Sequence, residues 1–147
     1  MNNKRIGFTF IELMVVVAIL VILAATAVPR LVGRTDQARV AAAKADIDGN
    51  IAIALDLYEL DNGTYPATEQ GLAALASEPT SSPVPPDWNG PYLKKRKIPV
   101  DPWGRSYVYT QPGLHNTEDY DLFSYGSDGA EGGGDDVVNW EDETETE

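Results

Sequence analysis

The 147-residue chain contains no cysteine and only one histidine, which excludes several kinds of site. Without cysteine there are no disulfides, no thiolate nucleophiles and no thiolate metal ligands. A single histidine, His115, excludes a metal site built from several imidazoles. Basic residues are also scarce, with 11 Lys and Arg against 23 Asp and Glu and a formal net charge of −12. That balance argues against a nucleic-acid partner, because binding to phosphates requires a basic surface.

The charges that are present are unevenly distributed along the chain. Residues 1–44 carry six basic and two acidic groups, whereas residues 111–147 carry twelve acidic groups and no Lys or Arg. Between positions 8 and 28, Glu12 is the only ionisable side chain. The chain therefore has a short basic start, a long apolar segment, a polar body and an acidic end.

The apolar segment is long enough to cross a membrane as a helix. Residues 8–28 are 21 positions, and an α-helix of that length matches a bilayer core of about 30 Å. An ordinary secretory signal has a similar composition, and Ala25-Thr26-Ala27 matches its small-x-small cleavage pattern. Glu12 argues against a disposable signal, because a carboxylate at the centre of a membrane segment costs about 2.5–3.5 kcal/mol, and less near an end.

The residues around this carboxylate form a specific motif, Gly7-Phe8-Thr9-Phe10-Ile11-Glu12-Leu13-Met14. The motif resembles the leader junction of type IV pilins and of the pseudopilins of type II secretion. The resemblance implies that a prepilin peptidase cleaves between Gly7 and Phe8 and N-methylates Phe8, leaving the apolar segment on the mature chain. It also implies that Glu12 pairs with the new α-amine of Phe8 in a neighbouring subunit during assembly. The alternative is that Glu12 is protonated or reaches the headgroups.

A helical pattern continues beyond the apolar segment. Apolar residues then recur at spacings of 7, 4, 4 and 3, which predicts one face of a helix; they are Val40, Ile47, Ile51, Leu55 and Tyr58. Three more residues widen the expected buried face: Ile53, Leu57 and Leu60. We predict one helix from Phe8 to Leu60, stopped by Asp61-Asn62-Gly63 and either kinked or locally unwound at Pro29.

Short segments separated by turns follow this helix. Thr68 begins a predicted short helix that runs to Leu75, and the five prolines between positions 79 and 91 predict an extended surface loop. Three strands are predicted, at residues 106–110, 119–125 and 137–140, with Trp140 in the core or covering the sheet. Lys94-Lys95-Arg96-Lys97 is the only basic cluster of the body, and it is either a solvated surface or a contact with an acidic neighbouring subunit.

Five motifs in the body extend the resemblance over nearly the whole chain. They occur in the same order in the major pseudopilins of type II secretion: residues 62–66, 68–72, 90–93, 101–104 and 124–129. The resemblance implies an α+β, type IV pilin-like fold, in which a long N-terminal helix packs on a small antiparallel sheet. The predicted organisation is a leader (1–7), a transmembrane and filament-core half of the helix (8–29), an amphipathic half (30–62), a periplasmic α/β body (63–140) and a disordered acidic tail (141–147).

Residues 125–136 combine clustered carboxylates with five glycines. The pattern alone is compatible with a solvated loop or with a hard cation such as calcium, which takes 6–8 oxygen ligands. The resemblance favours calcium, held by the side chains of Asp128, Asp135 and Asp136 and by the carbonyls of Tyr125 and Ala130. A further ligand of the family falls at Gly133, which can offer only its carbonyl.

The resemblance implies a structural subunit and not an enzyme. His115 has no Gly-x-Ser-x-Gly motif near it, and the many C-terminal acids single out no catalytic pair. The implied product is a periplasmic pseudopilus, assembled from a single-pass inner-membrane precursor. The expected partners are further copies of the chain, minor pseudopilins, an inner-membrane assembly platform and the prepilin peptidase. The alternatives are a type IV pilin or minor pseudopilin, and a secreted calcium-binding module released after Ala27.

Overall fold

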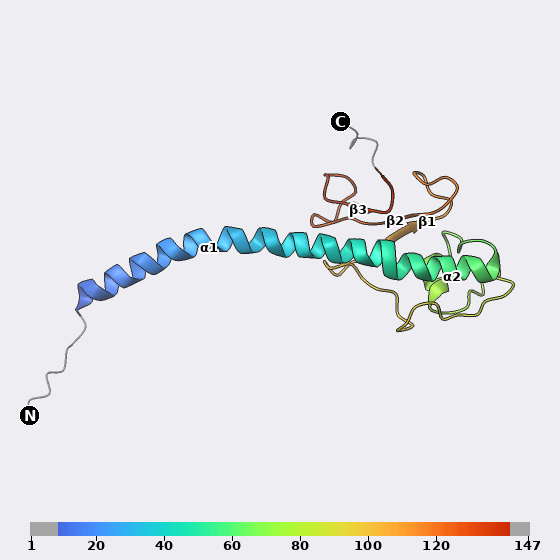
Figure 1. Cartoon of the computed structure of the whole chain (residues 1–147), viewed down its shortest axis with the longest axis horizontal. Coiled ribbons are helices and arrows are strands. Elements are labelled where there is room, and N and C mark those ends of the chain that lie inside the picture. Colours follow the sequence, from blue (N-terminus) through green and yellow to red (C-terminus); the bar gives the residue numbers. More distant parts are fainter. Residues whose placement is uncertain (1–8, 142–147) are drawn as a thin grey trace, which may run out of the picture. The chain divides into compact units, whose positions relative to one another are not determined.

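The computed structural model describes residues 9–141, with side chains described for residues 9–23 and 35–141 (Figure 1). The predicted cleavage point between Gly7 and Phe8 lies outside the described residues, as does the acidic tail after Glu141. The chain divides into two compact units, Met1–Gln37 and Ala38–Glu147.

Three helical segments follow one another where the sequence predicts a single helix. They are α1 (Phe10–Ala45), the π-helical segment η1 (Asp46–Ile51) and α2 (Ala52–Asn62). Thr9 caps α1, because its Oγ1 accepts the Glu12 N–H at 3.3 Å. The predicted stop is confirmed, since Gly63 has a left-handed φ of 75° and its N–H donates to the Glu59 carbonyl at 2.7 Å. The backbone at Pro29 is helical.

Within this long helix, η1 forms a π-helical turn instead of an α-helical one. The π turn holds both Ile47 and Ile51 in the core, where neither is more than 1% exposed. The same turn carries Asp46, whose Oδ2 accepts the Tyr107 hydroxyl at 3.1 Å. We infer that these contacts with the rest of the body stabilise the wider turn.

The predicted buried face is confirmed at Ile47, Ile51, Leu55 and Tyr58, but not along its whole expected width. Ile53, Leu57 and Leu60 are 60%, 44% and 79% exposed, and Val40 is 41% exposed. The first three come two positions after Ile51, Leu55 and Tyr58, and two positions correspond to about 200° around a helix. They therefore point away from the core instead of widening the buried face.

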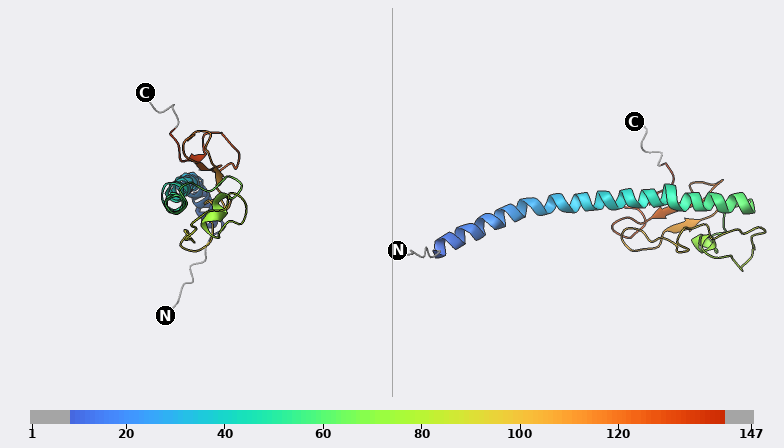
Figure 2. Two further views of the ribbon diagram at one scale, coloured as in Figure 1. Left: turned by 90° about the vertical axis from the view of Figure 1, so that its right-hand side faces the viewer. Right: turned by 60° about the horizontal axis from the view of Figure 1, so that its bottom comes forward.

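A three-stranded antiparallel sheet packs against the helical segments of the unit Ala38–Glu147 (Figure 2). It consists of β1 (Val108–Thr110), β2 (Asp121–Ser124) and β3 (Val137–Val138) in the order β1-β2-β3, so the three predicted strands are confirmed in shortened form. Tyr109 is paired with Leu122, and both are buried. On the other face Trp140 covers the sheet, with its ring 5.4 Å from that of Phe123.

Side-chain hydrogen bonds hold the segment between α2 and the sheet against the rest of the body. The predicted helix at residues 68–75 is reduced to a 3-10 helix, η2 (Gly71–Leu75), and Thr68 does not cap it. The Thr68 hydroxyl instead exchanges two hydrogen bonds with the backbone of Gln111, at 2.8 and 2.9 Å. The proline-rich loop is fixed by Trp88, whose Nε1 donates to the Ala74 carbonyl at 2.9 Å.

The part of the chain that the structure describes contains no helix both long and apolar enough to span a bilayer.

Candidate assembly and metal sites

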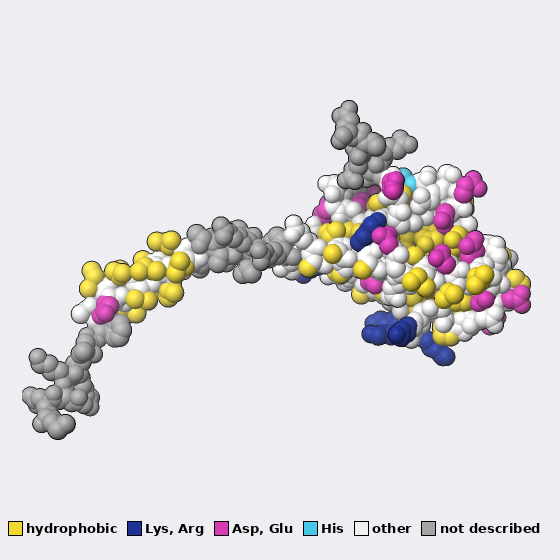
Figure 3. All heavy atoms as spheres, viewed as in Figure 1, with side chains coloured by type: hydrophobic (Ala, Val, Ile, Leu, Met, Phe, Trp, Pro, Cys, Tyr) yellow, Lys and Arg dark blue, Asp and Glu magenta, His cyan; other side chains and the backbone are white. Residues whose placement is uncertain are grey.

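The first part of α1 presents apolar side chains to its surroundings. All fifteen side chains from Thr9 to Leu23 are exposed, and Phe10 is 78% exposed. Figure 3 shows them as an apolar surface along this part of the helix. An apolar helix surface of this length is stable when lipid or other helices pack against it.

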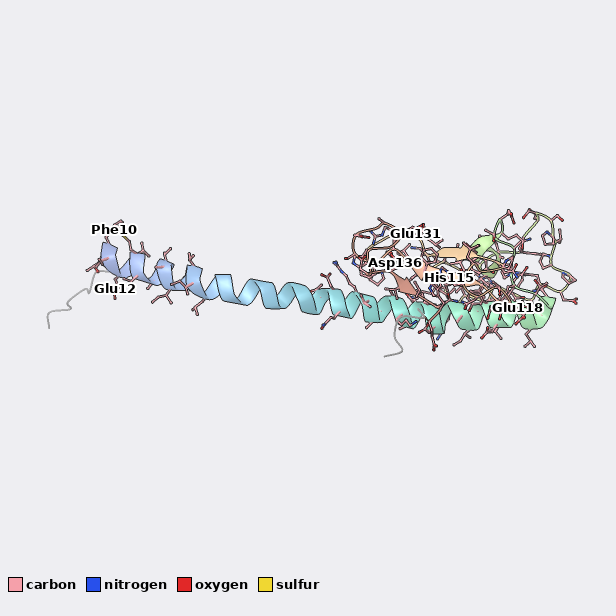
Figure 4. All side chains as sticks on the ribbon, turned by 90° about the horizontal axis from the view of Figure 1, so that it is seen from above. Phe10, Glu12, His115, Glu118, Glu131 and Asp136 are labelled. Atoms are coloured by element: carbon pink, nitrogen blue, oxygen red, sulfur yellow. The ribbon has the colours of Figure 1, made fainter. Side chains whose placement is uncertain are left out.

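Glu12 lies in the first turn of α1, and its side chain is exposed (Figure 4). The partial positive charge at a helix N-terminus favours a carboxylate there by about 0.3–1 kcal/mol. Within residues 9–23 and 35–141, no cation lies within ion-pair distance of this carboxylate. The predicted partner, the α-amine of Phe8 in a second copy, lies outside the described residues, so the assembly role of Glu12 stays a prediction.

Asp101 is a buried carboxylate whose hydrogen bonds connect the start of the C-terminal loop to the body. Asp101 is 3% exposed, and its Oδ1 accepts the N–H groups of Trp103 at 3.0 Å and Arg105 at 2.7 Å. Its Oδ2 accepts the hydroxyl of Ser124 at 2.6 Å. Burial by itself would raise the pKa of Asp101, but the hydrogen bonds outweigh that effect and hold the pKa below its ordinary value.

Arg105 connects this buried carboxylate to the first residues of the loop. Its Nε lies 3.6 Å from Asp101 Oδ2, and its Nη2 donates to the carbonyl of Gly126. Gly126 has a φ of 59°, and a Cβ at this position would overlap the carbonyl of Asp135. Glycine is therefore required here, both for its backbone conformation and for the close approach of the second half of the loop.

The two halves of the loop meet at Asp135. Its Oδ2 accepts the hydroxyl and the N–H of Ser127, both at 2.7 Å, and the N–H of Asp128 at 2.9 Å. The Ser127 hydroxyl and these N–H groups lower the pKa of Asp135. A Cβ at Gly133 would lie 3.0 Å from Asp128 Oδ2 and 3.4 Å from Asp135 Oδ1. The structure therefore brings the carboxylates of two predicted calcium ligands, Asp128 and Asp135, close to the Cα of Gly133.

The other predicted ligands are engaged in different contacts. Asp136 Oδ2 accepts the N–H of Gly132 at 2.8 Å, whereas its Oδ1 is buried and has no hydrogen-bond partner. The Tyr125 carbonyl accepts the Gly129 N–H at 3.2 Å, and the Ala130 N–H donates to Asp128 Oδ1 at 2.9 Å. Across the residues that the structure describes, no group of three acidic or histidine side chains is close enough to hold a metal ion.

This donor set nevertheless fits calcium chemically, because every donor is an oxygen. The unpartnered Oδ1 of Asp136 is a buried acceptor that an ion or a donor would satisfy. To bind one ion, Asp136 would have to turn toward Asp128 and Asp135.

Two structural contacts were not anticipated from the sequence. Asp121 is buried, and its two oxygens accept the N–H groups of Leu114, His115 and Asn116 at 2.7–2.9 Å. The His115 ring lies 3.1 Å from Asp121 through Nδ1 and stacks on Trp140 at 4.0 Å. The second is the bridge from Arg105 to Gly126. Its sequence signal is weak, because nothing local connects residues 21 positions apart.

Comparison with known proteins gives the family. Residues 30–140 match the model of "Type II secretion system (T2SS), protein G", and residues 2–28 match the "Prokaryotic N-terminal methylation motif". The chain belongs to the type II secretion protein G family. A curated relative, the type II secretion system core protein G of Pseudomonas aeruginosa, is 54% identical over 144 residues, covering 95% of this chain and 98% of the relative.

Other members of the protein G family support the same assignment. The core protein G of Vibrio cholerae is 47% identical over 142 residues, covering 94% of this chain and 93% of the relative. Among solved structures, the major pseudopilin of the type 2 secretion system of enterohaemorrhagic Escherichia coli matches with a TM-score of 0.66 and 40% identity. That match covers 75% of this chain and 89% of the solved one. The pilin-like α+β fold expected from the sequence is confirmed.

Proposed function

We propose that this protein G family member is the major structural subunit of a type II secretion pseudopilus, a periplasmic filament that supports export of folded proteins across the outer membrane. One observation of the structure carries the proposal: the fifteen exposed, mostly apolar side chains from Thr9 to Leu23. Once the segment leaves the membrane, bundling many copies keeps that surface out of water, and exposing it instead would cost about 25 cal/mol for each Å². The family assignment supports a filament over a membrane-resident monomer.

Processing precedes assembly in this proposal. A prepilin peptidase cleaves between Gly7 and Phe8 and methylates the new amine of Phe8. The match of residues 2–28 to the N-terminal methylation motif supports this step. Until assembly, residues 8–29 hold the subunit in the inner membrane as a single span, with the body in the periplasm.

Assembly then requires a register between neighbouring subunits. The proposed device is the pair formed by the Glu12 carboxylate and the α-amine of Phe8 in the adjoining copy. An ion pair away from water is far stronger than one at a surface, and an unpartnered carboxylate there is unfavourable. Further proposed partners are minor pseudopilins and an inner-membrane assembly platform.

Calcium is the proposed structural cofactor of the C-terminal loop. Asp128, Asp135 and Asp136 would hold the ion with the carbonyls of Tyr125, Ala130 and Gly133. The approach of the first two carboxylates and the unpartnered oxygen of Asp136 support this assignment. When bound, the ion supplies positive charge among adjacent carboxylates and stabilises the folded loop by mass action.

The proposed role is structural and not catalytic. The single histidine is used to hold a loop, since its ring contacts the buried Asp121 and stacks on Trp140.

Mass spectrometry of the mature N-terminus, together with electron microscopy of assembled material, tests the proposal. A methylated Phe8 at the N-terminus and filaments of the processed chain are the expected results. A mature chain that begins at Val28 would instead identify a secreted module and overturn the proposal.

A further inference from the structure

The basic cluster (Lys94, Lys95, Arg96 and Lys97) occupies a turn that is fixed to the body. Leu93 before it is 4% exposed, and Val100 after it forms an antiparallel bridge with Ser106. Within the turn, the Arg96 N–H donates to the Leu93 carbonyl at 2.9 Å, and Arg96 has a left-handed φ of 49°. All four side chains of the cluster are exposed. The turn therefore presents four positive charges outward from a defined position.

No acidic group of the described residues neutralises the basic cluster. The ion pairs Lys44–Asp48, Arg105–Asp101 and His115–Asp121 of that part of the chain do not involve the cluster. Figure 3 shows the cluster as the group of Lys and Arg side chains at the lower edge of the body. Four like charges side by side in a chain of net charge −12 favour an anionic partner.

The surface beside the cluster contains a cavity lined by both lysines and apolar side chains. Three of its lysines line a cavity of about 400 Å³ together with Asn50, Ile98 and Val100. A cavity with lysines and apolar side chains matches a chain that carries carboxylates and short aliphatic groups.

The acidic tail, residues 141–147, is such a chain. Its sequence is Glu-Asp-Glu-Thr-Glu-Thr-Glu, so it holds five acidic groups in seven positions. It follows the part of the chain that matches the family model, which ends at residue 140. In an extended conformation Glu143, Glu145 and Glu147 would project from one side, and Thr144 and Thr146 from the other. Three carboxylates in a row match the lysines, and the threonine methyl groups match the apolar wall.

We propose that the acidic tail of one subunit docks on the basic cluster of a second copy. Within the unit Ala38–Glu147, the end of the described chain and the loop that carries the cluster lie at opposite ends of the body when it is seen along the helix (Figure 2, left). Tail and cluster are therefore two different surfaces of one subunit. A contact between different surfaces can repeat from copy to copy, and it gives an open helical filament when its rotation does not close into a ring. The inference rests on the proposed function, which places many copies side by side.

Cysteine cross-linking tests this contact, because the full chain has no cysteine of its own. One population carries Lys95→Cys and the other carries Thr146→Cys, and the two are mixed before assembly and then oxidised. The expected product is a covalent dimer with one copy of each variant. Its yield should fall severalfold in 1 M salt, where the Debye length shortens to about 3 Å. It should fall similarly when the five tail acids are replaced by Gln and Asn.

Two controls make the result specific. Val84→Cys replaces Lys95→Cys as a matched exposed position away from the cluster, and it should give little dimer. A chain with both Lys95→Cys and Thr146→Cys tests docking within one copy. Dimer yields equal to those of the Val84→Cys control, yields unaffected by the tail substitutions, or a link confined to one copy would each overturn the proposal.

Electron microscopy of the same samples separates this proposal from the proposed function. Filaments without the dimer refute the docking and leave the filament role intact. Dimers in samples that form no filaments support the docking and refute the filament role. Samples with neither refute both.

Discussion

Replacing Asp101 by Asn should loosen the C-terminal loop and destabilise the body. Asp101 is 3% exposed and accepts three hydrogen bonds, from the N–H groups of Trp103 and Arg105 and from the Ser124 hydroxyl. In the Asp101→Asn variant, the side-chain NH2 group takes the place of Oδ2 and can only donate hydrogen bonds. The Ser124 hydroxyl therefore loses its acceptor, and the Arg105 guanidinium loses the negative charge beside it. Hydrogen bonds to charged groups contribute about 1.5–3 kcal/mol and neutral ones about 0.5–1.5 kcal/mol. We therefore expect the free energy of unfolding to fall by about 1–3 kcal/mol.

Urea unfolding of the full chain in detergent, followed by near-ultraviolet circular dichroism, measures this loss. The matched control is Asp87→Asn, an exposed carboxylate whose replacement should change the free energy of unfolding by no more than about 0.5 kcal/mol.

The pH dependence of the stability gives a second check. Since folding lowers the pKa of Asp101 below its ordinary value of 3.8, its stabilising contribution is complete above that pH and is lost as pH falls through the folded pKa. Equal stability of the two variants at pH 7, or a difference unchanged in strong acid, would refute the reasoning.

Three further predictions concern assembly, calcium and the core. Glu12→Ala should leave cleavage and methylation intact, as seen by mass spectrometry, but abolish filaments under the electron microscope; normal filaments would rule out the register role. Asp128→Ala should lower the melting temperature relative to wild type by more with calcium present than in chelator, where only its hydrogen bond to the Ala130 N–H is lost; Glu131→Ala should melt like wild type in both. A difference of the same size in calcium and in chelator would count against the site. Ile51→Ala should destabilise the body by about 2–5 kcal/mol in urea, and Ile53→Ala by less than about 1 kcal/mol; similar losses would mean that the two faces of the helix are misassigned.

Much of the fold could be predicted because its signals are local. Apolar spacing located the helical face that carries Ile47 and Leu55, and Gly63 marked the helix end through its backbone conformation. The exposed Ile53 face was assigned to the core because hydrophobicity alone does not say which neighbour covers a side chain. The π turn at η1 has no strong local signal, since we attribute it to contacts such as the one between Asp46 and Tyr107, 61 positions apart.

The candidate metal site was predictable only in part for the same reason. Clustered carboxylates and glycines marked the loop, and the structure brings Asp128 and Asp135 to the same glycine. The sequence does not encode locally that Asp136 turns to the N–H of Gly132. It also gives no local sign that Arg105 reaches Gly126 from a different turn of the body.

The π turn at η1 has a consequence for how chains of this kind can differ in length. A π turn contains one residue more than an α turn, so removing a single residue there would restore ordinary helical hydrogen bonding without rotating the flanking segments. Single-residue gaps between relatives should therefore collect between Ala45 and Ala52, and a count of that interval across many relatives would check this. Elsewhere in the buried part of the helix, the same gap would turn every later side chain by about 100° and expose the core.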